Sequence, residues 1–543
     1  MRKTIDGPAF AQMIFCASAA LDENRQQLND LNVFPVPVGD TGTNRSLTMA
    51  SAANALRENT PAGVGEASSA AANALLRGAR GNSGVILSLL FRGISKGLRG
   101  KAECTAAEWA AAMNTGVTSA YKAVMKPAEG TILTVSRRAS ETAAELSKGG
   151  VADIEEILAG ALDTARVTLA DTVNMNPVLK KAGVVDAGGQ GYVVIFDAML
   201  LSLQGKFAPA AAPAPEAPAA EVKEEKAFTY SAEFTVARER KRDPQLLRSY
   251  LESIGGSLAM KETEKDLTVR IFTDAPGRAL TEALRFGSLQ TVKIENLRLA
   301  HKPAAEPVPE AAPAEPEEPE YAEPEKAVGF VAVCAGAGMK ELFLSLGADR
   351  VVTGGQTMNP STEDILREVN RTPAETVFVF PNNKNIIMAA EQCVRLCKKK
   401  VRVIPTRSVP QGVTALACMD PEEDANALEA SFRECVDRVH TALVTYAARD
   451  SDFDGHAIHA NEYLALLDGK MLGSYTGMEP LTAALNAAFR QLEPEFLTVY
   501  YGENVSETDA QGVSDTLSAA FPEADISVVN GGQPVYYYMI SAE

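Results

Sequence analysis

Two segments of low sequence complexity divide this chain into three stretches that can fold. Residues 207–226 are rich in Ala, Pro and Glu, and residues 302–326 repeat Pro and Glu with almost no large apolar side chain. Such segments bury too little apolar surface to offset the entropy lost on ordering, so we expect linkers there. Motifs that bind a partner are the alternative. The domains are then expected at 1–206, 227–301 and 327–543.

The charge and the cysteines limit the classes of protein. The 543 residues carry a formal net charge of -18, which argues against nucleic acid as a partner, because a basic surface is needed to displace phosphate counterions. The seven cysteines form no CxxC pair, so reduced thiols are expected. Neither a signal peptide nor an apolar run of about 18 residues is found, which predicts a cytoplasmic protein without a transmembrane segment.

The first stretch is predicted to be nearly all helical. Ala- and Leu-rich windows place apolar residues three and four positions apart, which is the spacing of one helix face. The clearest windows are Ala52–Leu56, Ala67–Arg77, Ala106–Val124 and Ile154–Leu169. Any site chemistry must then come from the connections between the helices.

Four of those connections are marked by glycine next to Ser, Thr or Asp. They are Asn32–Arg45, Gly78–Gly84, Lys126–Thr134 and Ala182–Gly191. Glycine-rich turns at helix N-termini expose backbone N–H groups, and the helix dipole favours phosphate there. Structural capping uses the same residue types and is the alternative, but four such turns in one domain favour a nucleotide site. The sequence contains neither a Walker loop nor a GxGxxG motif after a strand.

The first connection resembles a known nucleotide site. Asn-Val-Phe-Pro-Val-Pro at 32–37, then Gly-Asp-Thr-Gly-Thr-Asn at 39–44, is similar to the ATP-binding domain of the dihydroxyacetone-kinase type. With the three later loops in the same order, the chain resembles more closely the catalytic subunit of bacterial fatty acid kinase. The resemblance implies an all-α antiparallel helical barrel, a small α+β middle domain and a DegV-like α/β C-terminal domain.

The resemblance also implies an activity. A kinase of this family uses ATP and Mg²⁺ to phosphorylate the carboxylate of a fatty acid, giving an acyl phosphate. A separate DegV-family lipid-binding protein presents the fatty acid, and the family suggests a homodimer. The C-terminal domain is expected to dock the partner.

Site residues are carried over by position. Asp40 and Asn32 are implied metal ligands. Thr43, Asn44, Ser83 and Gly84 are implied to contact phosphate, Gly130 and Thr131 to line the nucleotide pocket, and Asp186 and Gly188 to face the ribose or base. Arg137 and Lys181 are the nearest cations for the transferring phosphoryl group. For these two, a solvated place on a helix is the alternative.

Val38 departs from the family pattern, which has an aspartate at this position. Valine offers no lone pair to a metal ion, so reduced metal binding and turnover are expected. Three interpretations stay open: inactivation of an otherwise normal kinase, natural divergence to a pseudokinase, or compensation by a nearby acid such as Asp30.

The other two stretches carry strand patterns. Alternating residues at Phe228–Val236 and Leu267–Phe272 predict a small α+β domain. Apolar strands at Val328–Val333, Val377–Phe380 and Lys400–Ile404 alternate with helical windows, which predicts a parallel sheet. The loops Gly354–Thr362 and Pro381–Asn385 would follow strands at the ligand-binding edge of that sheet. Residues from 464 onward would form a second lobe. His456 and His459, three positions apart, could share a helix face, and a structural role is favoured for them because no acidic or thiol partner matches them.

Two other functions fit parts of the sequence. A kinase for a small hydroxyl substrate of the dihydroxyacetone type would need only the first domain. A non-catalytic scaffold would be consistent with Val38.

Overall fold

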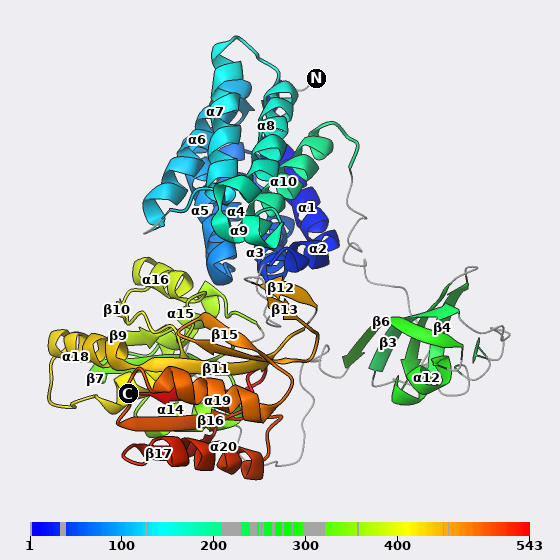
Figure 1. The fold of residues 1–543 in the computed structure, drawn as a ribbon. Coiled ribbons are helices and arrows are strands. Elements are labelled where there is room, and N and C mark those ends of the chain that lie inside the picture. Colours follow the sequence, from blue (N-terminus) through cyan, green and yellow to red (C-terminus); the bar gives the residue numbers. More distant parts are fainter. Residues whose placement is uncertain are drawn as a thin grey trace, which may run out of the picture. The chain divides into compact units, whose positions relative to one another are not determined.

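The computed structural model consists of two compact units, one made of Met1–Ala211 with Glu317–Glu543 and one of Ala212–Pro316 (Figure 1). The structure describes residues 3–32, 40–124, 127–207, 230–238, 247–248, 251, 255–262, 266–273, 276–284, 286–296, 321–355, 358–448, 450–453 and 456–543. Val38 lies outside them. The linker boundaries predicted from the sequence stay a prediction.

The N-terminal region of the first unit is helical, as predicted. Its elements are β1 (Thr4–Ile5), α1 (Gly7–Glu23), α2 (Arg25–Asp30), α3 (Thr41–Glu58), α4 (Val64–Arg77), α5 (Gly81–Leu98), β2 (Cys104–Thr105), α6 (Ala106–Ala123), α7 (Ile132–Lys148), α8 (Ile154–Met175), α9 (Pro177–Ala182) and α10 (Ala187–Leu203). The helices α1, α3, α4, α5, α6, α7, α8 and α10 each pack against the next in that order, and α10 packs against α1. Their apolar faces meet in one core that includes the fully buried Trp109 and Phe10.

Side-chain caps begin several of these helices. Asp6 accepts a hydrogen bond from the Ala9 N–H at 2.8 Å, and Asp153 accepts one from the Glu155 N–H at 2.9 Å. Thr105 and Glu108 form a reciprocal capping box at the start of α6. Each cap satisfies a backbone donor that the first helical turn leaves unpaired, which fixes the residue at which the helix starts.

The C-terminal region of the same unit contains two sheets. The first is parallel, in the order β10-β9-β7-β8, with β7 (Lys326–Cys334), β8 (Arg350–Thr353), β9 (Ala374–Phe380) and β10 (Lys400–Val403). Its helices are α14 (Ala337–Ser345), α15 (Thr362–Arg371), α16 (Ile387–Leu396), α17 (Val409–Ala417) and α18 (Ala425–Arg438). The predicted parallel sheet and α/β character are therefore confirmed.

The second sheet has the order β15-β14-β11-β18-β16-β17. Its strands are β11 (His440–Tyr446), β14 (Tyr463–Leu467), β15 (Lys470–Tyr475), β16 (Phe496–Tyr501), β17 (Asp525–Asn530) and β18 (Tyr538–Ala542), with the helices α19 (Met478–Phe489) and α20 (Glu507–Ala520). Only β16 and β17 pair in parallel among these strands. A short hairpin is formed by β12 (Ser451–Phe453) and β13 (His456–Ile458).

Two expectations about individual residues are wrong. His456 begins the strand β13 and His459 follows its end, so the two do not share a helix face. Cys418 and Cys435 are joined by a disulfide, so not all seven cysteines are reduced thiols. Their Cα atoms are 6.8 Å apart, because α17 and α18 pack against each other.

The second unit contains an antiparallel sheet in the order β4-β5-β3-β6. Its elements are β3 (Tyr230–Arg238), β4 (Gly255–Glu262), β5 (Asp266–Thr273), α12 (Pro276–Ala283) and β6 (Gly287–Asn296). Phe234, Val269 and Ile271 are buried in its core. Across the described part of both units, no helix has the length and apolarity needed to cross a bilayer.

Glycines let α5 and α6 approach closely. A Cβ atom on Gly93 would lie 2.5 Å from both the Gly116 Cα and the Thr115 carbonyl oxygen. We predict that Gly93→Ala lowers the free energy of unfolding by about 1–3 kcal/mol, because backbone atoms cannot move aside. The matched control is Gly512→Ala in α20, where an added Cβ meets nothing within 4 Å.

That control is expected to gain about 0.5–1 kcal/mol from helix propensity. Denaturant titration of both variants measures the difference. Equal effects of the two substitutions would contradict the close approach of α5 and α6.

Candidate functional site

The first glycine-marked connection ends at the N-terminus of α3. Asp40 is the N-cap residue of this helix, and its side chain makes no capping hydrogen bond to the helix. Asn29 caps the helix instead, because its Oδ1 accepts from the N–H groups of Gly42 at 2.8 Å and Thr43 at 3.2 Å. The Asp40 carboxylate is therefore left available for other partners.

Asn32 and Thr43 lie close to this turn. The Asn32 Oδ1 accepts a hydrogen bond from the Thr41 hydroxyl at 2.8 Å, and the Thr43 hydroxyl accepts one from Asn29 Nδ2 at 3.1 Å. The Thr43 backbone N–H is already engaged by Asn29, so only its hydroxyl proton is left for a further acceptor.

Asp40 receives a hydrogen bond from a residue more than 300 positions away. Asn359 Nδ2 donates to Asp40 Oδ2, which brings the loop after β8 onto the start of α3. Burial raises the pKa of Asp40 above its ordinary value, while hydrogen bonds from Asn44 and Asn359 act in the opposite direction. The carboxylate is thus partly desolvated but held by donors that favour its ionised form.

The second connection packs directly on the first. Gly81 has a φ of 58°, and a Cβ atom on it would lie 2.8 Å from Asn44 Nδ2. A Cβ atom on Gly84 would lie 2.5 Å from the Thr48 hydroxyl oxygen. Glycine at these two positions therefore lets α5 begin against α3, with Ser83 in its first turn.

Arg80 joins this connection to the C-terminal region. Its Nη1 donates to the Asn359 carbonyl at 2.8 Å, and its Nη2 lies 3.5 Å from Asp364 Oδ2. The Thr362 N–H also donates to the Ala79 carbonyl at 3.1 Å. Asn359 and Thr362 thereby attach the segment before α15 to both the first and the second connection.

The third and fourth connections meet at Asp186, the N-cap residue of α10. Its Oδ2 accepts from the Gly189 N–H at 2.6 Å, and the Ile132 N–H at the start of α7 is a second donor. Burial raises the pKa of Asp186, while these two donors and the charge of Arg45 lower it. Thr131, the N-cap residue of α7, immediately precedes Ile132.

A buried arginine, Arg45, links the third and fourth connections to the first. Arg45, in the second turn of α3, is 0% exposed and donates through Nη1 to the Gly188 carbonyl at 2.5 Å. Gly191 makes room for the guanidinium, because a Cβ atom there would lie 2.5 Å from Arg45 Nη1. Burial lowers the pKa of Arg45 to about 10, and Asp186 acts in the opposite direction.

The two cations predicted to act on the transferring phosphoryl group are Arg137 and Lys181. Arg137 is bound by two carboxylates, Glu129 and Glu141, each at 3.0 Å, and its Nε donates to the Tyr121 hydroxyl at 3.3 Å. These partners already neutralise its charge, which does not favour a role at a phosphoryl group. Lys181 is exposed in α9, shortly before the turn that leads to Asp186.

Gly130 is needed both for the turn of the third connection and for the packing of that turn against α8. Its φ is 74°, and a Cβ atom there would lie 2.8 Å from the Met175 Cβ. Its N–H donates to the Thr134 hydroxyl at 2.8 Å, and that hydroxyl donates to Glu129 at 2.7 Å. The third connection is thus held mainly by its own side chains.

A cavity of about 1000 Å³ lies where the first two connections face the C-terminal region. Asn32, Asp40, Asn44 and Ser83 line its helical side. The C-terminal side contributes polar residues after β8, β9 and β10, and apolar residues farther along: Asn359, Asn382, Asn383, Lys384, Asn385, Arg407, Ser408, Gln411, His440, Val439, Leu443, Leu466 and Met539. Asp30 is not among the described lining residues, and it accepts a hydrogen bond from Gln26.

Sequence reasoning missed Asn29, Arg45, Arg407 and the contact of Asn359 with Asp40. Arg45 ends the first motif, and its burial has no local sequence signal. The loop of Asn359 is expected from the sequence as a ligand loop of its own sheet, but nothing in the sequence indicates that it reaches Asp40.

The electrostatic interaction between Arg45 and Asp186 yields a stability prediction. Asp186→Asn keeps an acceptor for the Gly189 N–H but leaves the buried guanidinium without its negative neighbour. We expect the free energy of unfolding to fall by about 3 kcal/mol. Asp153→Asn, which changes a cap of α8, is the matched control and should cost less than about 1 kcal/mol.

Denaturant titration followed by circular dichroism measures both changes. A loss for Asp186→Asn no larger than that for Asp153→Asn would show that the buried charge does not depend on Asp186.

Comparison with known proteins places this arrangement in a family. Residues 35–201 match the DAK2 domain, residues 227–304 match the middle domain of the FakA-like fatty acid kinase family, and residues 329–543 match the C-terminal domain of the same family. Protein YloV of Bacillus subtilis is 39% identical over 556 residues, which cover 100% of both chains.

Two solved structures match parts of the chain. The dihydroxyacetone kinase of C. freundii in complex with AMP-PNP and Mg²⁺ is 22% identical, with a TM-score of 0.28, and the match covers 35% of this chain and 33% of that one. The Fak B3 protein of Streptococcus pneumoniae, loaded with linoleic acid, is 13% identical, with a TM-score of 0.29, over 40% of this chain and 99% of that one. From the family models and the full-length match to YloV, the chain belongs to the FakA-like fatty acid kinase family and is a kinase subunit with a DAK2 domain.

Proposed function

We propose that this chain is the ATP-binding subunit of a kinase that phosphorylates the carboxylate of a fatty acid, giving an acyl phosphate. The observation that carries the proposal is the placement of Asp40, Asn44 and Ser83 on one wall of a cavity of about 1000 Å³. That volume is large enough for a nucleotide together with an acceptor group. A DegV-family protein that presents the fatty acid, and a homodimer, belong to the same proposal.

The residues at the first connection fit a magnesium ion. Mg²⁺ is usually held by one or two carboxylates together with phosphate oxygens and water. Asp40 supplies one carboxylate and Asn32 an amide oxygen, and both line the cavity. When bound, the ion would neutralise charge on the triphosphate. The described residues contain no group of three or more His, Cys, Asp or Glu side chains that could hold a metal ion. Phosphate oxygens and water would therefore complete the coordination shell of the magnesium ion.

The chain's own groups would orient the phosphates. Ser83 lies in the first turn of α5, where backbone N–H groups and the helix dipole favour an anion. Asn44 lines the same cavity, and a Cβ atom on Gly81 would lie 2.8 Å from its Nδ2. Lys384 and Arg407 face the same cavity from the C-terminal region and would attract a negatively charged acceptor.

A carboxylate acceptor suits this set of residues. A fatty acid is already ionised at neutral pH, so no general base is required to activate it. None of the four histidines lies in the helical region, and His440 lines the C-terminal side of the cavity, where this reaction does not require it as a base. Positioning and charge neutralisation would then supply most of the rate enhancement.

Val38 gives the most direct test of this function. Val38→Asp restores the carboxylate of the family pattern two positions before Asp40. We expect acyl-phosphate formation to rise about tenfold or more, because even the partners of metal ligands contribute about 10–100-fold. Asp40→Asn should abolish turnover. The assay supplies ATP, Mg²⁺ and a DegV-family protein loaded with a fatty acid, and traps the acyl phosphate with hydroxylamine.

Asp171→Asn, at an exposed carboxylate of α8, is the control and should leave turnover unchanged. No gain in Val38→Asp would refute a missing metal ligand at position 38. Full activity in Asp40→Asn would refute the metal role of Asp40.

The raised pKa of Asp40 predicts how nucleotide binding depends on pH. The ion needs the ionised carboxylate, so Mg²⁺-dependent nucleotide binding should be lost as the pH falls through that raised pKa. Asn359→Ala removes a donor that favours the ionised form, so the pKa should rise further and the loss should begin at a higher pH. Titration with a fluorescent ATP analogue over a pH series measures this.

Asn385→Ala is the matched control, since Asn385 lines the same cavity but makes no hydrogen bond to Asp40 in the described structure. If the two variants lose nucleotide at the same pH as the unmodified chain, Asn359 does not act on Asp40.

A further inference from the structure

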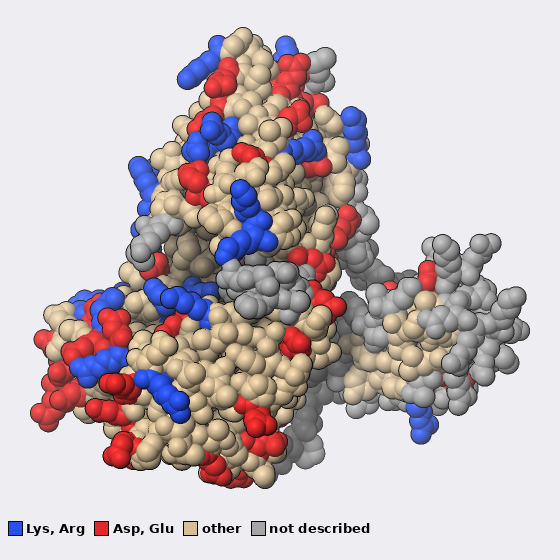
Figure 2. Space-filling view, in the orientation of Figure 1, with Lys and Arg blue, Asp and Glu red and all other residues tan. Residues whose placement is uncertain are grey.

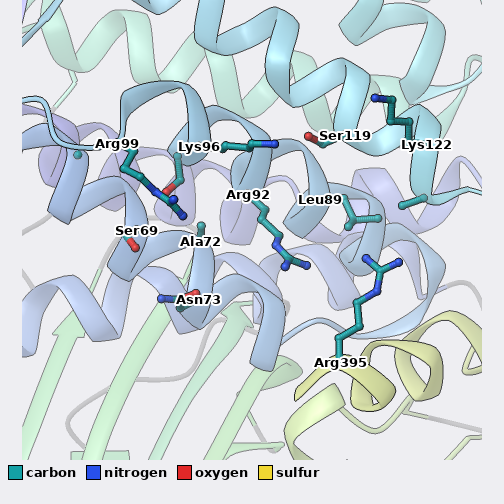
Figure 3. Close-up of a pocket in the computed structure, with 13 residues that line it drawn as sticks. Ser69, Ala72, Asn73, Leu89, Arg92, Lys96, Arg99, Ser119, Lys122 and Arg395 are labelled. Atoms are coloured by element: carbon teal, nitrogen blue, oxygen red, sulfur yellow. The ribbon is translucent and has the colours of Figure 1, made fainter. Parts of the chain in front are cut away.

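A second hollow, of about 550 Å³, lies between the helical region and the C-terminal region. Figure 3 shows the side chains that line it, from α4, α5, α6 and α16. Five of them are cations, namely Arg92, Lys96, Arg99, Lys122 and Arg395. On the face drawn in Figure 2, Lys and Arg side chains lie above and below a hollow between these two regions.

The positions of these five cations follow from the helices to which they belong. Arg92, Lys96 and Arg99 follow each other at helical spacing, so they project from one face of α5 and its C-cap. Lys122 comes from the last turn of α6, and Arg395 from the last turn of α16. All five are exposed, so each can meet a ligand from solvent.

Few negative charges offset this cluster. None of the described lining residues is Asp or Glu, although the whole chain has a net charge of -18. Arg395 has an electrostatic contact with Glu391, one turn earlier in α16. The four cations of the helical region form no ion pair with another described residue. Their mutual repulsion costs free energy, which a bound anion would recover.

The uncharged lining fits a ligand rich in oxygen atoms. Ser69, Ser95, Ser119 and Asn73 supply hydroxyl and amide donors around the cations. None of the described lining residues is aromatic, so a base or ring would find no aromatic side chain to stack on. The charged and hydroxyl groups of the lining are suited to a charged ligand.

The hollow is separate from the cavity beside Asp40. The two share no lining residue. Ser83 and Lys96 both belong to α5 but are separated by 13 positions, or about 20 Å along the helix. A ligand in one would not fill the other.

We propose that this basic hollow binds a small, freely diffusing polyanion that carries two or more phosphate groups. Its volume suits a small molecule, and its five cations match a charge that a single phosphate does not carry. Because Arg395 belongs to the C-terminal region and the other four to the helical region, the bound polyanion contacts both. This site is independent of the proposed kinase reaction.

The test uses the full chain and inorganic tripolyphosphate as the probe, in metal-free buffer, with calorimetry as the readout. We expect saturable binding that weakens with added salt. The variant Arg92→Gln/Lys96→Gln/Arg99→Gln should bind about tenfold more weakly or worse. Arg395→Gln alone should also weaken binding.

The control Lys148→Gln/Arg490→Gln neutralises two exposed cations outside the hollow and should keep the original affinity. Thermal unfolding adds a second readout, since tripolyphosphate should raise the melting temperature of the unmodified chain but not of the triple variant.

Three results would overturn the proposal. The first is no binding of tripolyphosphate, and the second is equal affinity in the triple variant and the control. The third is binding only to vesicles that contain phosphatidylglycerol, measured by co-sedimentation, which would mean that the cations meet a lipid surface instead of a free polyanion.

Discussion

The helical region depends on how one buried positive charge is accommodated. Arg45 is fully enclosed, and two of its nitrogen atoms, Nε and Nη2, have no hydrogen-bond partner among the described residues. Its compensation comes from the Gly188 carbonyl and the charge of Asp186. Because Asp186 also receives the Ile132 N–H, the guanidinium in α3 is linked through Asp186 to the starts of α7 and α10. The glycines at 188 and 191 are needed because any side chain there would meet it.

A second long-range contact connects the site to the C-terminal region. Asn359 donates to Asp40, and its carbonyl accepts from Arg80, so one residue touches both the first and the second glycine-marked connection. The site therefore has two walls from separate parts of the chain. In the proposed function, the C-terminal region contributes to the nucleotide and acceptor pocket as well as offering a docking surface.

The sequence predicts those features that depend on local patterns. Apolar spacing identifies α4, α6 and α8, and apolar runs identify β7, β9 and β10. These elements are predictable because the local order of apolar and polar residues determines which face is buried. Long-range features are not predictable in this way. The pairing of Asn359 with Asp40, the burial of Arg45 and the disulfide of Cys418 and Cys435 depend on packing between distant segments. The helical expectation for His456 fails because a spacing of three residues fits a helix, while the chain forms a hairpin there.

The central claim is that the loops around Asp40 hold a nucleotide and a divalent cation. It is tested most directly by a crystal structure of the full chain with a non-hydrolysable ATP analogue and Mn²⁺, using anomalous scattering to locate the ion. The account predicts a peak at coordination distance from the Asp40 carboxylate, with the phosphates between it and Ser83. An ion or a nucleotide bound elsewhere, with Asp40 still held only by Asn359, would contradict it.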